Sequence, residues 1–144
     1  MKRLALLSLM LAASALSAAP VPKELKTQAT TVGTWRLGAL DPKDRTVRPA
    51  GEQYWIIDAD GGVIFTGAPA RPTGAKPTEI FKFDPKTGEV DHNLVGGNQK
   101  TLLGRYELRD DLLTISLSSS GQARSESASE GNYVGHLQRV KETK

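Results

Sequence analysis

The sequence of 144 residues contains no cysteine, and this absence removes several classes of structure. Without cysteine there is no disulfide framework, no thiolate-bound zinc site and no lipid anchor carried on a cysteine. The two histidines, His92 and His136, are too few to build a structural zinc site by themselves. The folded part of the chain must therefore be stabilised by its own hydrophobic core, and we expect no metal or other cofactor.

The common local signatures of catalysis and nucleotide binding are also missing. The sequence has no G-x-S-x-G, no P-loop and no H-E-x-x-H. The run from Asp58 to Gly61 resembles the start of a calcium loop, but the later oxygen ligands and the distal glutamate are lacking. Asp-Gly is also a strong signal for a tight hairpin, and a hairpin is the interpretation we favour. We predict that the protein is not an enzyme.

Neither sign of charge dominates. The chain has 19 basic and 16 acidic residues, and Lys2 and Arg3 belong to an N-terminal segment that we expect to be removed. The remaining 17 basic residues form no cluster in the sequence. We therefore expect no nucleic-acid partner.

The only long hydrophobic run is at the N-terminus, where residues 4–13 follow Lys2 and Arg3 and precede the mostly small residues 14–19. This is the arrangement of a secretory signal peptide, and the run is too short to span a bilayer. We expect residues 1–19 to be cleaved, residues 20–32 to form a flexible arm, and the mature chain to have no membrane span. The protein would then be exported to the periplasm or the extracellular space, and we expect it to be a monomer.

A helical period of more than about ten residues is absent after residue 19, and a period of two takes its place. In residues 102–117 one face is formed by Leu102, Tyr106 and Leu108, and the other carries Arg105 and Glu107. The alternation resumes after a polar turn at residues 109–111, which is typical of a β-hairpin with one buried face.

Similar alternation elsewhere predicts about eight strands joined mostly by short turns, at residues 33–40, 52–58, 62–67, 78–84, 89–95, two within 102–117, and 132–141. Because the strands follow one another, an all-β, antiparallel up-and-down barrel over residues 33–141 is the expected fold. Residues 121–130 are small and polar, and we expect a mobile loop or a poor edge strand there.

Two resemblances support the barrel. Gly33-Thr34-Trp35 resembles the G-x-W motif of lipocalins and related calycin barrels. In that family the tryptophan closes one end of the barrel and an arginine after the last strand packs across it, which implies structural closure by Gly33, Trp35 and Arg139.

Residues 33–141 are also similar to a lipocalin-like domain family of small exported bacterial proteins that is common in planctomycetes. The shared pattern includes Phe83-Asp84-Pro85, the run from Leu103 to Leu108, the run from Asp111 to Ile115, and the closing Leu137-Gln138-Arg139. One departure is that Arg124 is followed by Ser125 where the family pattern has proline. This resemblance implies a fold and no reaction.

Strand alternation predicts which side chains point into the barrel, and the expected interior set is Trp55, Ile57, Phe81, Phe83, Val90, His92, Leu94, Tyr106, Ile115 and Leu117. As ligand-binding residues we select Trp55, Phe81, Phe83, His92 and Tyr106 from this set. His92 is expected to serve packing and hydrogen bonding, and His136 is expected to face solvent.

Two classes of function remain open. An exported lipocalin-like barrel of eight strands can hold one small apolar molecule, which would make the protein a binding module. If side chains fill the interior, the barrel would instead act through its loops as a structural or interaction domain with an envelope protein as partner. A third, less favoured hypothesis is a hydrolytic enzyme that uses His92 as general base.

Overall fold

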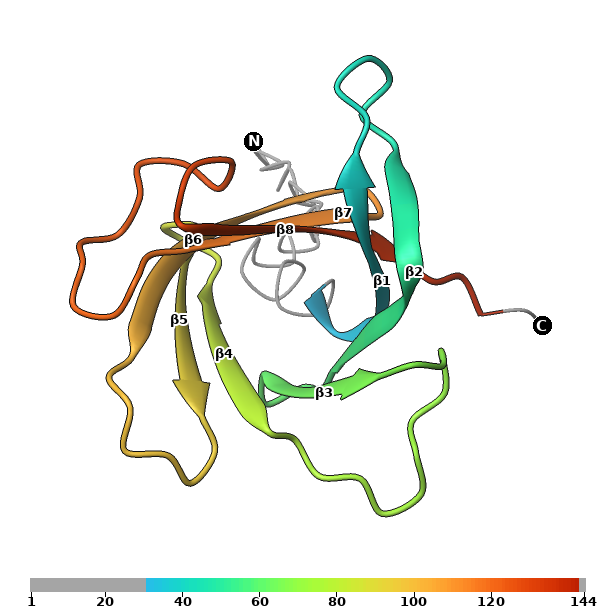
Figure 1. Cartoon of the computed structure of the whole chain (residues 1–144), viewed down its shortest axis with the longest axis horizontal. Helices are drawn as coiled ribbons and strands as arrows, with labels where there is room; N and C mark the ends of the chain where they lie inside the picture. Colours follow the sequence, from blue (N-terminus) through green and yellow to red (C-terminus); the bar gives the residue numbers. More distant parts are fainter. Residues whose placement is uncertain (1–30, 143–144) are drawn as a thin grey trace, which may run out of the picture.

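The computed structural model describes residues 31–142, and these residues form a barrel of antiparallel strands (Figure 1). The strands are β1 (Gly33–Leu40), β2 (Val47–Ile57), β3 (Gly62–Thr66), β4 (Glu79–Asp84), β5 (Glu89–Leu94), β6 (Leu102–Arg109), β7 (Leu112–Leu117) and β8 (Tyr133–Arg139). Each strand pairs with the next in the sequence, and β8 pairs with β1 to close the barrel. The predicted all-β, eight-stranded up-and-down barrel is therefore confirmed. Within residues 31–142 no helix is long and apolar enough to cross a membrane.

Because neighbouring strands are antiparallel, alternate connections lie at the same end of the barrel. Short turns at residues 58–61, 85–88 and 110–111 lie at one end, together with the start of β1 and the end of β8. We call this the closed end. The longer loops 41–46, 67–78, 95–101 and 118–132 lie at the other end, which we call the mouth.

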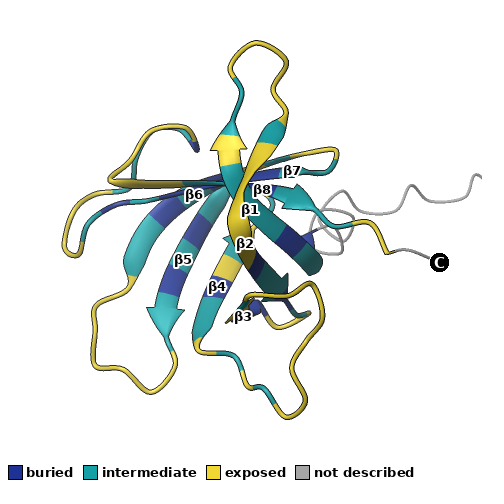
Figure 2. Cartoon of the chain, turned by 45° about the vertical axis from the view of Figure 1, so that its right-hand side comes forward, coloured by how far each residue is buried: buried dark blue, intermediate teal, exposed yellow. Residues whose placement is uncertain are grey.

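Side chains on the inward face of the strands fill the barrel interior, as a period of two predicts. Figure 2 shows the buried residues as dark blue segments of the strands. The buried core consists of Trp35, Ile57, Val63, Phe81, Val90, Tyr106, Leu113, Ile115 and Leu137. Leu37, Trp55, Phe83, Leu108 and Leu117 are partly buried and pack against it. This core draws on all eight strands, so it ties the barrel together around its whole circumference.

Strand β2 begins earlier than the sequence predicts. The expected start was residue 52, whereas β2 starts at Val47 and its first part pairs with β1 alone, Gly38 opposite Pro49. Pairing of β2 with β3 begins only at Tyr54. At Pro49, strand β2 therefore has β1 as its one paired neighbour. The missing backbone N–H of Pro49 removes no hydrogen bond to β3, because β3 is not paired with β2 at this position. The sequence did not predict this extension, because the prolines and charged residues of 41–51 are typical of a turn.

Residues 121–130 form a loop, which is one of the two alternatives predicted for this segment, and they contain no edge strand. The β7–β8 loop folds back over the outside of the barrel, where the Ser116 hydroxyl bonds to the Ser125 hydroxyl at 2.9 Å and to the Ser127 carbonyl at 3.1 Å. The Arg124 guanidinium reaches further and donates to the Val90 and Gly104 carbonyls at 2.9 and 2.6 Å. These bonds hold the loop against β5, β6 and β7.

The junction between β3 and β4 is the weakest in the barrel. Only two residue pairs join these strands, Gly62 with Ile80 and Val63 with Glu79, because the chain leaves β3 into the loop 67–78. Gly61 packs closely at this junction: its φ is +80°, and a Cβ there would lie 2.1 Å from the Phe81 carbonyl oxygen. The upper half of β3, towards the mouth, therefore has β2 as its one paired neighbour.

Two expectations concern residues outside the described part. The signal peptide at residues 1–19 and most of the flexible arm at 20–32 precede residue 31, where the description begins.

Candidate functional site

The closed end is plugged by Trp35 and Arg139. The Trp35 side chain is completely buried, and its Nε1–H donates to the Thr31 carbonyl at 2.9 Å. The Arg139 guanidinium lies 4.1 Å from the centre of the Trp35 ring and donates to the Val32 carbonyl at 3.0 Å. A cation over an indole face is an attractive contact, and here it also covers the ring. Beside this plug an open hollow of about 230 Å³ is lined by residues 31–32, 58–61 and 81–83, which include Phe81 and Phe83.

Gly33 is part of the same closure. Its φ is +140°, and a Cβ at this position would lie 2.9 Å from Arg139 Nη1. Glycine therefore lets the backbone approach the guanidinium where β1 starts.

The five residues selected from the sequence as ligand-binding lie in one network of rings inside the barrel. Trp55 contacts Phe81 at 5.6 Å between centroids, and Phe81 contacts His92 at 4.7 Å. Phe83 lies 6.1 Å from Phe81 and 4.9 Å from Tyr106. These are contact distances for aromatic rings, so the rings fill the space between them.

Tyr106 is a protonated phenol in this network. Burial, and secondarily the charge of Asp84, raises the pKa of Tyr106 to about 12. The side chain therefore stays neutral at physiological pH and packs as an aromatic ring with a polar end.

The mouth exposes aromatic surface at its rim. Phe65 lies opposite Trp55 and meets it edge to face, with 5.0 Å between ring centroids. Phe65 is 42% exposed although it shares the inward face of β3 with the fully buried Val63. An open hollow of about 340 Å³ is lined here by residues 52–55 and 65–67. A volume of this size lies at the lower end of the range for small-molecule sites.

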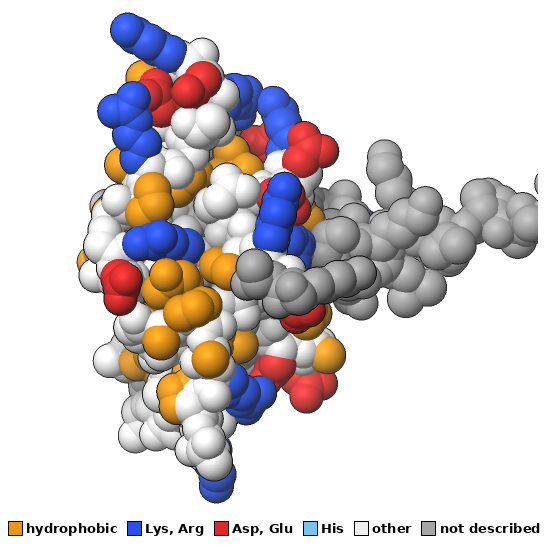
Figure 3. Space-filling view, turned by 90° about the vertical axis from the view of Figure 1, so that its right-hand side faces the viewer, with side chains coloured by type: hydrophobic (Ala, Val, Ile, Leu, Met, Phe, Trp, Pro, Cys, Tyr) orange, Lys and Arg blue, Asp and Glu red, His pale blue; other side chains and the backbone are white. Residues whose placement is uncertain are grey.

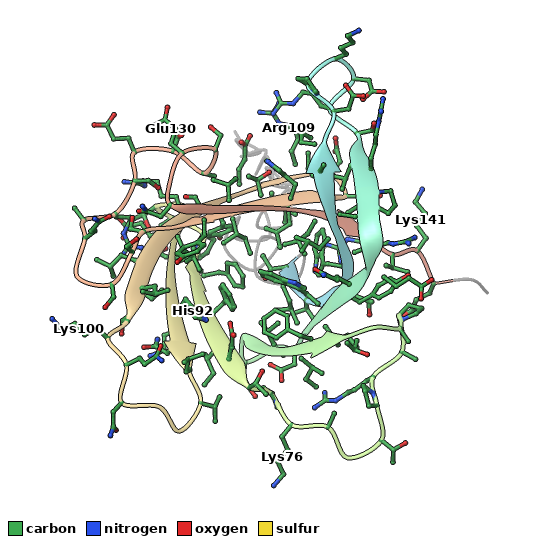
Figure 4. All side chains as sticks on the ribbon, in the orientation of Figure 1. Lys76, His92, Lys100, Arg109, Glu130 and Lys141 are labelled. Atoms are coloured by element: carbon green, nitrogen blue, oxygen red, sulfur yellow. The ribbon has the colours of Figure 1, made fainter. Side chains whose placement is uncertain are left out.

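A carboxylate and an imidazole stand beside these rings. Glu79 is the first residue of β4 and has the same strand parity as Phe81, and its Oε2 lies 2.5 Å from His92 Nε2. The His92 residue is 8% exposed, and its other ring nitrogen, Nδ1, is buried and has no hydrogen-bond partner among the described residues. Figure 4 labels His92 on the inner side of β4 and β5, whereas Lys76, Lys100, Glu130 and Lys141 lie at the periphery.

His136 lies on the outer face of β8, as expected, but it is only partly exposed. Its Nδ1 lies 3.2 Å from the Thr114 hydroxyl oxygen, and burial lowers the pKa of the imidazole below its ordinary value. It is not close to the ring network, so the two histidines do not form a common site.

A larger open hollow of about 950 Å³ lies between the start of β1, the end of β8 and the loop 67–78, and is lined by residues 32–34, 69–70 and 139–142. It has no aromatic lining, and its one arginine, Arg139, is already engaged with Trp35. Its apolar lining is aliphatic, from Val32, Ala70 and Val140, so it offers no aromatic ring for stacking.

Strand parity predicted the ring network but missed two residues of the rim. Phe65 follows Val63 by two residues and Glu79 precedes Phe81 by two, so alternation alone places both inward. The pairing of Glu79 with His92 joins positions 13 residues apart across two strands, and only their register shows that they meet.

The face of the molecule in Figure 3 has no cluster of one charge. On the face shown in Figure 3, Lys and Arg side chains are interspersed with Asp and Glu and with hydrophobic patches. Residues 31–142 contain no group of three or more His, Asp or Glu residues placed to hold a metal ion.

No family model matches the chain, and comparison with curated proteins and with solved structures gave no significant match.

Proposed function

We propose that the chain is an exported, non-enzymatic, lipocalin-like binding module, and that it binds a small molecule with an apolar ring at the barrel mouth. The observation that carries this proposal is the exposed Phe65, packed on the partly buried Trp55 beside an open hollow of about 340 Å³. An exposed aromatic ring on the inward face of a barrel has no role in core packing, and burying it under a ligand is favourable.

The rim is a better binding place than the deep interior. The Phe83 ring contacts the rings of both Phe81 and Tyr106, and the core beneath them is buried. A ligand in the deep interior would have to displace these side chains, whereas at the rim it would cover Phe65 without repacking the core.

A filled barrel that acts through its loops is the second candidate, and the continuous buried core favours it. Its partner would be an envelope protein rather than a small molecule. Hydrolysis with His92 as base has less support. A base needs access to its proton, and the unpartnered Nδ1 of His92 is buried.

The experiment is a titration with 2-phenylethanol, a small soluble phenyl compound, followed by calorimetry and by tryptophan fluorescence. Trp35 is completely buried, so Trp55 is the tryptophan placed to respond. The expected result is saturable binding at a 1:1 ratio that Phe65→Ser weakens. The matched control is Val134→Ser, because Val134 is 39% exposed and lies on the outer face of β8.

Binding that survives Phe65→Ser, or that Val134→Ser weakens equally, would contradict a site at the rim. An absence of any binding to the wild-type protein would favour the filled barrel.

A further inference from the structure

We infer that the ligand at the rim is a short, uncharged peptide with an aromatic side chain, and that it adds as an extended strand to the open edge of β3. This inference rests on the proposed binding at the rim and names the chemical class of the ligand. The peptide backbone would pair with β3 at Phe65, and its aromatic side chain would cover the Phe65 ring.

The backbone of β3 faces β2 at every second residue. The Asp58 N–H donates to the Gly62 carbonyl at 2.9 Å where the β2–β3 hairpin begins, and this bond sets the alternation. Ile64 and Thr66 therefore exchange their backbone hydrogen bonds with β2. The N–H and C=O of Phe65, which lies between them, point away from β2 and towards the β4 side.

The hydrogen bonds on the β4 side have the same alternation. The Gly61 carbonyl accepts from the Phe81 N–H at 2.8 Å. The Val63 carbonyl accepts from the Thr78 N–H at 3.1 Å. Phe65 is the next residue of this set, and no partner is found for its N–H or C=O among residues 31–142.

Pro77 explains why pairing with β4 stops before Phe65. The register that places Val63 opposite Glu79 would place Phe65 opposite Pro77. Proline has no N–H to donate to the Phe65 carbonyl. The Pro77 ring lies instead beside Gly62, where a Cβ would be 2.6 Å from Pro77 Cγ. The edge of β3 is therefore open from Phe65 onwards.

This open edge is accessible. Phe65 and Gly67 are both exposed, and the hollow of about 340 Å³ at the rim is lined by residues 65–67 on this strand. A Cβ at Gly67 would have one neighbouring atom within 4 Å, the Glu52 carbonyl oxygen at 3.8 Å. Space for a second chain is thus present beside the unpaired backbone.

The edge of β3 also lacks the usual protection against strand addition. Residues 47–53 of β2 are likewise unpaired with β3, but they include Pro49 and the charged Arg48 and Glu52. Proline and charged side chains hinder the pairing of a further strand. Residues 64–67 contain neither.

An extended peptide fits this edge better than a second copy of the barrel. A peptide supplies N–H and C=O groups at alternate residues, which is how strands are added to sheet edges. The open edge is short, and the loop 67–78 leaves β3 directly beyond it (Figure 1). A flexible peptide can enter beside this loop, whereas the rigid edge of another barrel would meet it.

The charges around the edge favour an uncharged peptide. The loop 67–78 carries Arg71 and Lys76, and the neighbouring strands carry Glu52 and Glu79. Neither sign is in excess, so the surroundings attract neither an acidic nor a basic peptide.

The experiment compares the uncharged peptide acetyl-Ser-Thr-Phe-Thr-Ser-amide with 2-phenylethanol, which carries the phenyl ring without a peptide backbone. Each is titrated into the protein by calorimetry. We expect the peptide to bind about tenfold more tightly than the alcohol, because its backbone adds hydrogen bonds to Phe65.

Two further peptides test the backbone pairing, one with an N-methyl group on the Phe and one with an N-methyl group on the Thr that follows it. The N–H groups of neighbouring residues in a strand point to opposite sides, so only one of these methyl groups can lie against β3. We expect one methylated peptide to lose about tenfold in affinity and the other to bind like the parent peptide.

Amide hydrogen exchange locates the peptide on β3. The Phe65 N–H should exchange fast in the free protein and with 2-phenylethanol bound, and about tenfold more slowly with the peptide bound. The matched control is the Ile64 N–H, which is bonded to β2 and should be protected in all three states.

The outcomes separate this inference from the proposed function. Equal affinity of the two methylated peptides, or unchanged exchange at Phe65 with the peptide bound, would overturn the inference. Binding of 2-phenylethanol that the peptide does not exceed would also overturn it and leave binding at the rim intact. A Phe65 N–H that is protected without peptide in a dimeric protein would assign the edge to a second copy and overturn the peptide. If no probe binds, both the inference and the proposed function are overturned.

Discussion

At the scale of single residues, the two ring nitrogens of His92 differ in their surroundings. Its Nε2 bonds to Glu79, while Nδ1 is buried without a partner and Phe81 lies against the ring. The imidazole therefore serves two purposes, since it fills space in the ring network and fixes the position of the Glu79 carboxylate.

Replacing His92 should reveal which of these contacts stabilises the fold. We expect His92→Leu to lower the free energy of unfolding by about 1–3 kcal/mol, because it leaves the partly buried Glu79 carboxylate without its donor. His92→Gln retains a donor and should cost less. Urea unfolding of both variants measures the difference, and equal losses would show that the hydrogen bond to Glu79 contributes nothing.

His136 should make the stability depend on pH. Because burial lowers the pKa of the folded imidazole from its usual 6.5, the unfolded chain binds a proton more readily. The contribution of His136 to stability is therefore fully present above pH 6.5, the pKa in the unfolded chain. It is lost as the pH falls from 6.5 to the lower pKa of His136 in the folded protein. Urea unfolding at about pH 7.5 and about pH 5 should show a smaller loss of stability in His136→Gln than in the wild type. An identical loss would contradict this assignment.

At the scale of elements, the β7–β8 loop is attached to the barrel through one side chain more than any other. Arg124 donates to the carbonyls of Val90 and Gly104, and also to Asp91 Oδ1 at 2.8 Å. The arginine thus replaces regular strand pairing as the means by which this long segment covers the sheet.

We expect Arg124→Ala to destabilise the fold by about 1–3 kcal/mol, because it removes several charge-assisted bonds at once. Amide hydrogen exchange should accelerate in residues 118–132. Arg109→Ala is the control: Arg109 is 57% exposed and pairs with Glu107 of the same strand, so its loss should cost less than about 1 kcal/mol. Unchanged exchange in the loop of the Arg124 variant would show that other contacts hold it.

The sequence predicts short-range features of these elements better than long-range ones. The β6–β7 hairpin and the inward side chains follow from alternation, because both depend on neighbouring residues. The early start of β2 depends on pairing with β1, and the position of the β7–β8 loop depends on contacts of Arg124 with residues 20 and 34 positions away. Neither kind of contact leaves a periodic signal in the sequence.

At the scale of the whole molecule, the two ends of the barrel differ. Trp35 and Arg139 seal the closed end, a continuous core fills the middle, and the exposed Phe65 lies beside the hollow at the mouth. This asymmetry leads to the central claim, that the barrel is a rigid support for one small-ligand site at its rim.

The most direct test of that claim is to map the bound position of 2-phenylethanol by backbone and aromatic NMR chemical shifts during a titration. The account predicts saturable shifts concentrated at Trp55, Phe65 and Thr66, which line the hollow, with Trp35 and Leu113 at the opposite side of the core unchanged. Shifts centred on the closed end or on the outer surface, or no saturable shift at any residue, would contradict it.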